Sequence, residues 1–171
     1  TTMEFNKVGF WTIKVKVKSD ELQLSAETGI LVKSRTEAPD IGEVAPPTKT
    51  KTNPKGANLR FITTAPEPDP DLYSISFDEA VKTGLPTVIT FSTPAYCRSG
   101  ACGPQTKVLS ALEDQYKGRI NFIHVEIFDN PAEMLNSGDP SVGIESPVID
   151  TWNFHTEPWT FTINNSGIVV G

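Results

Sequence analysis

The residues of this chain with the clearest chemistry are its two cysteines, Cys97 and Cys102, which have four residues between them. A cysteine attacks a disulfide or binds a soft metal only as its thiolate. In a chain with no other cysteine, so close a pair does not make a disulfide framework, and closing a small loop contributes little stability. The pair therefore predicts redox or metal chemistry, with a structural clip as the plain alternative.

The sequence around the second cysteine favours Cys102 as the more readily ionised thiol. Gly103 and Pro104 follow it, and proline suits the first turn of a helix. A helix N-terminus has free N–H groups and a partial positive charge, which stabilise a thiolate. Cys97 lies further out on the loop, and Arg98 can assist either sulfur. We expect Cys102 to be the reactive thiol, with Cys97 as the open alternative.

Charge is unevenly divided along the chain. Residues 1–60 carry 10 Lys or Arg and 7 Asp or Glu, whereas residues 61–171 carry 5 and 14. Binding to nucleic acid depends on clustered Lys and Arg, so the acidic second half argues against such a partner. No apolar run approaches the roughly 18 residues of a membrane span. Any membrane tether is therefore expected outside this chain.

Composition divides the chain into three ranges. In residues 1–34, apolar and polar residues alternate from Trp11 to Lys18, which predicts a small β fragment. This fragment either packs on the main domain or forms the tail of a β-sandwich domain. Residues 35–70 hold 7 of the 14 prolines, a composition typical of a linker. Residues 71–171 are expected to form the main domain.

The main domain carries alternating strand and helix signals. Ser76, with Glu79 three residues later, predicts a helix start with a capping box. The extra stretch from about Ala132 to Ile149 is read as an insertion. The predicted elements, in order, are a short helix at 77–81, a buried strand at 87–91, the Cys loop, a helix at 103–117, a strand at 120–128, the insertion, and a hairpin at 159–170.

This order, with the Cys loop between a buried strand and its helix, resembles the thioredoxin fold. Cys102-Gly103-Pro104 resembles the start of the family's Cys-Gly-Pro-Cys motif, and Glu157-Pro158 resembles its cis-proline loop. The turn Asp129-Asn130-Pro131 and the hairpin turn at 165–167 resemble turns of that family in their place along the chain. The resemblance implies an α/β fold, with a central mixed sheet flanked by helices, after the β fragment and the Pro-rich linker.

Among thioredoxin-like proteins, the Cys loop is similar to bacterial exported or lipid-anchored domains. That resemblance implies a thiol–disulfide oxidoreductase with Cys97 and Cys102 as its catalytic pair and with no cofactor. Tyr96, Glu157 and a cis Pro158 would then contact the substrate. The implied partners are protein thiol or disulfide substrates or a redox partner. The implied location is extracytoplasmic: periplasmic, cell-surface or secreted.

The chain departs from the family pattern at several positions. If Cys102 takes the first-cysteine position, Gln105 replaces the second cysteine; if Cys97 takes it, the loop is two residues longer. The family's buried acid is replaced by Thr90. The chain also stops at Gly171, before the family's last strand and helix, so the domain is expected to lack them.

Two other functions stay open. A metallochaperone could hold copper or zinc with Cys97, Cys102 and His155. A redox-inactive binding module would keep the two cysteines as a permanent clip. His124, within a predicted strand, is instead expected to be a buried histidine with satisfied hydrogen bonds.

Overall fold

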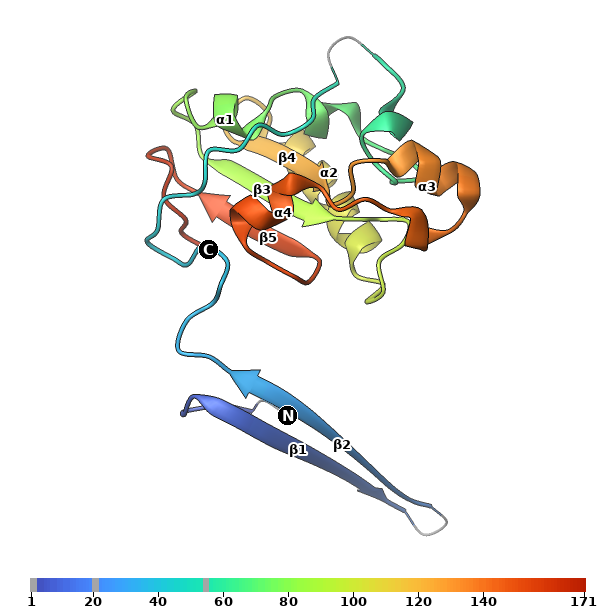
Figure 1. The fold of residues 1–171 in the computed structure, drawn as a ribbon. Helices are drawn as coiled ribbons and strands as arrows, with labels where there is room; N and C mark the ends of the chain where they lie inside the picture. The colour runs from blue at the N-terminus through green and yellow to red at the C-terminus, as the bar shows by residue number, and fades with distance from the viewer. Residues whose placement is uncertain (1–2, 20–21, 54–55) are drawn as a thin grey trace. The chain divides into compact units, whose positions relative to one another are not determined.

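The computed structural model describes residues 3–19, 22–53 and 56–171. The chain forms two compact units, Thr1–Thr36 and Glu37–Gly171, whose elements are shown in Figure 1. Residues 20–21 and 54–55, which belong to the predicted β fragment and linker, lie outside the described residues.

The first unit is a β-hairpin. β1 (Gly9–Lys18) pairs antiparallel with β2 (Gln23–Val32) along the full length of both strands. The predicted alternation is present, and Lys14 on the polar face forms an ion pair of 2.9 Å with Glu27. Val15 on the apolar face is exposed. An isolated two-stranded hairpin is marginally stable in water, because it buries little of its apolar face.

The second unit is built on a three-stranded mixed sheet of order β4-β3-β5. The central strand β3 (Thr87–Ser92) is parallel to β4 (Asn121–Glu126) and antiparallel to β5 (Trp159–Ile163). The long helix α2 (Cys102–Tyr116) connects β3 to β4. The predicted mixed α/β architecture is confirmed at this level. The shorter helices are η1 (Leu59–Phe61), η2 (Pro70–Tyr73), α1 (Phe77–Ala80), α3 (Pro131–Ser137), η3 (Pro140–Val142) and α4 (Pro147–Trp152).

Apolar side chains cover both faces of the sheet. Helix α4 lies in front of the sheet in Figure 1, on its near face. Phe91 of β3 packs against Trp152 of this helix, with ring centroids 4.8 Å apart, and Phe77 of α1 lies 5.3 Å from the same indole. On the far face, Leu109 of α2 belongs to a second cluster with Phe122. Val88 of β3 packs against this second cluster, whereas its neighbour Ile89 belongs to the first, so adjacent residues of the central strand face opposite sides of the sheet.

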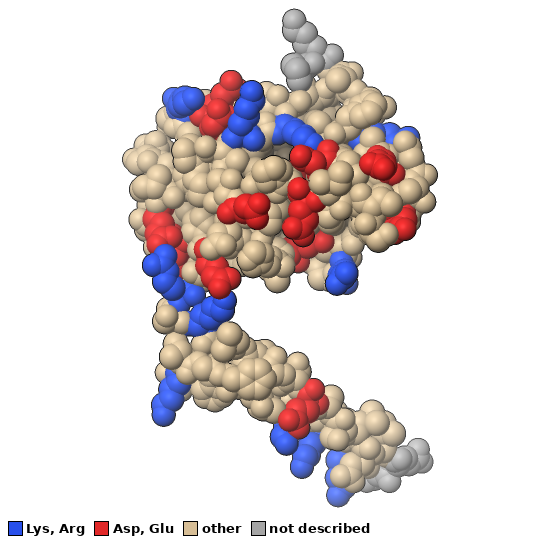
Figure 2. Space-filling model, in the orientation of Figure 1, with Lys and Arg blue, Asp and Glu red and all other residues tan. Residues whose placement is uncertain are grey.

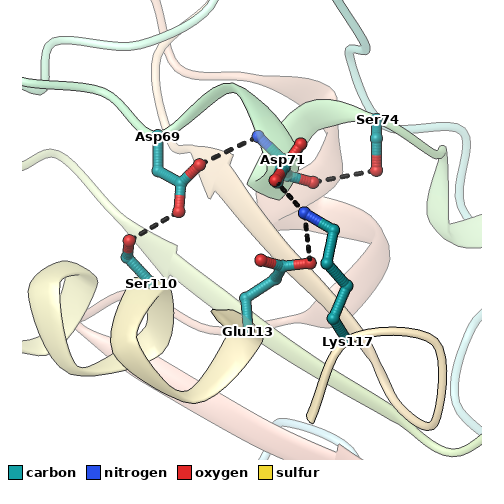
Figure 3. Close-up of polar contacts among 6 residues, drawn as sticks. All are labelled: Asp69, Asp71, Ser74, Ser110, Glu113 and Lys117. Atoms are coloured by element: carbon teal, nitrogen blue, oxygen red, sulfur yellow. Dashed lines mark hydrogen bonds and ion pairs between the residues drawn. The ribbon is translucent and has the colours of Figure 1, made fainter. Parts of the chain in front are cut away.

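Polar contacts hold η2 against α2 (Figure 3). The hydroxyl of Ser110 donates to Asp69, and the ammonium of Lys117 pairs with Asp71. Lys117 also lies 3.8 Å from Glu113, one turn earlier in the helix. These contacts fix the orientation of the helix that begins at the second cysteine.

The range predicted as a linker is irregular, but much of it packs on the second unit. Ala38 and Ala45 are buried in the core of that unit. The amide of Thr50 donates to the hydroxyl of Ser76 at 2.9 Å, and the hydroxyl of Thr50 accepts from the amide of Phe77 at 3.0 Å. Ser76 is the N-cap residue of α1, as predicted, yet it makes no capping hydrogen bond. The capping-box prediction was wrong, because Thr50 supplies the cap from 27 residues away.

Trp152 is the residue on which we expect the near-face core to depend. Truncation to alanine removes an indole that is fully buried among aromatic rings, and should lower the free energy of unfolding by about 3–5 kcal/mol in urea titrations. The control is Val108→Ala on the exposed face of α2, which should change it by less than about 0.5 kcal/mol. Equal effects of the two variants would contradict this account of the core.

Candidate functional site

The two cysteines form a disulfide at the start of α2. Their Cα atoms are 5.9 Å apart, within the roughly 4.4–6.8 Å predicted for a bonded pair. Cys102 is the first residue of the helix and is fully buried, whereas Cys97 lies on the preceding loop and is partly exposed. The loop turns at Gly100, whose φ of 69° suits glycine. The hydroxyl of Ser99 lies 3.2 Å from the Cys97 sulfur.

Gly103 and Pro104 lie in the first turn of α2, directly after Cys102. The helix thus starts one residue earlier than predicted. Because the helix dipole acts within its first turn, it acts most directly on Cys102. Complete burial opposes it, since removal from water disfavours a charged sulfur. The helix position that favours ionisation of Cys102 is therefore also the position at which its sulfur is buried.

A carboxyl group lies against the buried sulfur. Glu157 Oε2 is 3.5 Å from Cys102 Sγ and accepts a 2.7 Å hydrogen bond from the amide of Thr93. Glu157 is half-buried, and this burial raises its pKa although the Thr93 amide opposes the shift. The Glu157–Pro158 peptide bond is cis, as the resemblance implied. An ionisable carboxyl group thus sits within reach of the sulfur chemistry.

A surface pocket of about 660 Å³ opens beside the Cys loop. Tyr96 lines it and donates its hydroxyl to the carbonyl of Met134 in α3 at 2.8 Å. This contact ties the Cys loop to the inserted segment, which supplies one wall of the pocket. The other lining residues include Arg98, Ser99, Ile127, Phe128, Pro140, Ser141, Glu145, Ile149, Phe154, His155, Thr156 and Glu157.

The structure does not group His155 with the two cysteines as a metal site. His155 is exposed and lines the pocket. Among the described residues, the potential ligand atoms that lie within 4.8 Å of one another belong to Cys97, Cys102 and Glu157. In the disulfide form both sulfurs are already bonded, so neither is available as a thiolate ligand.

His124 is a buried structural residue, as predicted. Its Nδ1 lies 2.8 Å from the hydroxyl of Tyr73 and its Nε2 lies 2.9 Å from the hydroxyl of Ser92. Burial lowers the pKa of His124 to about 4, so the ring is neutral at pH 7. Both ring nitrogens are occupied, and the residue belongs to the scaffold behind the site.

A second carboxyl group, that of Glu126, belongs to the hydrogen-bond network around Glu157, and no sequence pattern assigned it a role. Glu126 ends β4 and is buried, and burial raises its pKa to about 7. The amide and the hydroxyl of Thr64 both donate to its Oε2 at 2.7 Å. The available signal was an acidic residue at the end of a buried strand; its partner, 62 residues earlier in the chain, left no local pattern.

No family model, curated protein or solved structure matches this chain. Within the described residues, no helix combines the length and the apolar character needed to cross a membrane. The functional interpretation therefore depends on the geometry of the disulfide and its neighbours.

The buried histidine predicts a loss of stability in acid. The unfolded chain binds a proton at the ordinary histidine pKa of 6.5, whereas the folded protein resists it down to about 4. Burial of His124 therefore contributes stability that is lost as the pH drops from 6.5 to 4, whereas burial of Glu126, which raises its pKa to about 7, acts in the opposite sense over part of that range. In urea titrations, the free energy of unfolding of the wild type should fall relative to that of His124→Gln as the pH drops through this range. A difference between the two proteins that does not change with pH would contradict this account of His124.

Proposed function

We propose that the second unit carries out thiol–disulfide exchange through Cys97 and Cys102. The observation that carries this proposal is one accessible and one buried sulfur, bonded to each other at a helix N-terminus beside a carboxyl group. Exchange needs a sulfur that the partner can reach and a second sulfur that resolves the mixed disulfide. The pair meets both requirements.

The arrangement around the pair supports a thioredoxin-like assignment. A parallel β3-α2-β4 unit carries the Cys loop at its first strand-to-helix turn, and an antiparallel strand follows a cis proline. These features agree with the resemblance of the sequence to that family. The disulfide supports an extracytoplasmic location, because such bonds persist in oxidising compartments.

Accessibility favours Cys97 as the sulfur that meets the partner. Cys102 is buried, and Glu157 beside it disfavours a thiolate when the carboxyl group is charged. Cys97 is partly exposed next to the pocket. This order of roles reverses the one expected from the helix position alone.

Glu157 is suited to hold the proton of the resolving thiol. In the mixed disulfide, Cys102 gives its proton to the Glu157 carboxylate and attacks Cys97 Sγ. The Cys97–Cys102 bond forms and the bond from Cys97 to the substrate sulfur breaks. The substrate leaves as a thiolate and takes the proton from Glu157. The reverse sequence oxidises a substrate dithiol, so the same groups serve both directions.

The pocket beside the Cys loop suits an extended peptide as the substrate. It combines the aromatic rings of Phe128 and Phe154 with charged side chains of both signs, Arg98 and Glu145. Figure 2 shows Asp and Glu across the visible face of the second unit, with Lys and Arg interspersed toward its upper edge. Such a surface accepts a mixed polypeptide more readily than a phosphate backbone.

Single-cysteine variants test the assignment of roles. Cys102→Ser should trap a mixed disulfide through Cys97 with a substrate that carries a disulfide, such as insulin. Cys97 attacks one substrate sulfur and releases the other as a thiol, and the thiol that would resolve the mixed disulfide is missing. Cys97→Ser should trap little, because Cys102 is buried. Both variants should lose insulin reduction, and Val108→Ala, on the exposed face of α2, is the control that should keep it. Trapping through Cys102 instead would reverse the roles.

The reduction potential separates exchange from a clip. An exchanging pair should lie above about −300 mV, whereas structural disulfides typically lie below that value. A pair that resists reduction until the protein unfolds would identify a redox-inactive module. Stoichiometric, tight copper(I) binding by the reduced protein without insulin reduction would identify a metallochaperone.

A further inference from the structure

A chain of hydrogen-bonded groups links the buried Glu126 to the disulfide. Its Oε2 accepts from the hydroxyl of Thr64, and that hydroxyl shares a 3.1 Å hydrogen bond with the hydroxyl of Thr93. The amide of Thr93 donates to Glu157, which touches Cys102. Three residues from three separate segments, Thr64, Thr93 and Glu157, thus connect a buried acid to the resolving sulfur.

Glu126 itself has an unusual environment. Its Oε1 is buried and has no hydrogen-bond partner among the described residues. Burial is the main cause of its raised pKa; the negative charge of Glu157 adds to it, and hydrogen bonds from Thr64 and Thr93 oppose it. A change of charge on either carboxyl group is therefore felt by the other.

Other titratable groups near Glu126 do not take over this role. The neutral ring of His124 precedes it on the same strand, and the phenol of Tyr73 stays protonated because burial raises its pKa. A cavity of about 220 Å³ along β4 is lined by Glu126 and by the ion pair between Lys51 and Asp129, which are 3.0 Å apart. Lys49 lines the same cavity. Lys51 is already neutralised by Asp129, so Glu157 is the partner through which Glu126 can act on the sulfurs.

We propose that Glu126 is a positioning residue for the exchange site: its charge, relayed through Thr64 and Thr93, sets how firmly Glu157 holds a proton and thereby the pH at which Cys102 ionises. This inference rests on the proposed exchange reaction, in which Glu157 takes the proton of Cys102. When Glu126 is neutral, Glu157 can stay charged and accept that proton. When Glu126 is charged, its repulsion favours a protonated Glu157, which cannot take the proton of Cys102, and the thiolate would form close to another negative charge. Cys102 then ionises less readily.

The test follows the Cys102 thiolate directly, by its ultraviolet absorbance in the reduced full chain carrying Cys97→Ser. Adding Glu126→Gln removes one negative charge, so the acid dissociation constant of Cys102 should rise by about threefold to tenfold. Adding Thr64→Val instead keeps the acid but removes a hydroxyl that stabilises its charge. Glu126 then stays protonated to higher pH, and the Cys102 titration should move in the same direction. Thr87→Val, at the opposite end of β3, is the matched buried control and should leave the titration unchanged.

A second readout uses the pH profile of insulin reduction by chains that keep both cysteines. The wild-type profile should show an inflection near pH 7, where Glu126 titrates, and Glu126→Gln should lose it. A Cys102 titration unaffected by Glu126→Gln and Thr64→Val overturns the inference, even if the wild type reduces insulin. If the titration shifts but no exchange occurs, the proposed function fails while the coupling between Glu126 and Cys102 holds.

Discussion

The burial of Cys102 at the first residue of α2 is the constraint on which the site depends. A sulfur at that position can meet its partner only if the preceding loop folds back, and the turn at Gly100 brings Cys97 to it. The same burial brings the sulfur against Glu157, just before β5. The Cys97 sulfur is therefore the accessible one and the Cys102 sulfur the buried one. In the proposed exchange, the first meets the substrate and the second resolves the mixed disulfide. The polar contacts between η2 and α2 hold the helix whose first residue is Cys102, and so help to fix the position of its sulfur.

Local sequence signals predicted much of this arrangement. The cysteine spacing, the glycine and proline after Cys102, and the apolar run of β3 act within a few residues, so each can be recognised without knowledge of the fold. The cis bond before Pro158 was predicted because the family resemblance fixed its place in the order of elements. Long-range contacts left no such signal. Thr50 caps α1, and Thr64 binds Glu126, across distances in sequence that no periodic pattern spans.

The proline content of residues 35–70 led to the prediction of a linker, but much of this range packs on the second unit. The reason is physical. Prolines and threonines suit an irregular chain, whether it is free or packed. Irregular chain that packs on a domain must satisfy its backbone groups by side chains or by neighbouring loops. Thr50 and Thr64 do so here through their amides and hydroxyls. Composition alone does not distinguish a tether from a segment that supplies threonines to a site.

Thr90 stands on the central strand, at the place where the resemblance to thioredoxins would put a buried acid. Its hydroxyl shares a 2.9 Å hydrogen bond with Thr160 on β5, so this position brings no carboxyl group toward the sulfurs. The two acids near the disulfide instead belong to the ends of the neighbouring strands, Glu126 at the close of β4 and Glu157 just before β5. An acid at a strand end can be partly solvated, as Glu157 is, or fully buried, as Glu126 is. The two carboxyl groups therefore differ in what they can do. Glu157 can exchange protons with solvent and substrate, whereas Glu126 responds through its hydrogen-bonded neighbours.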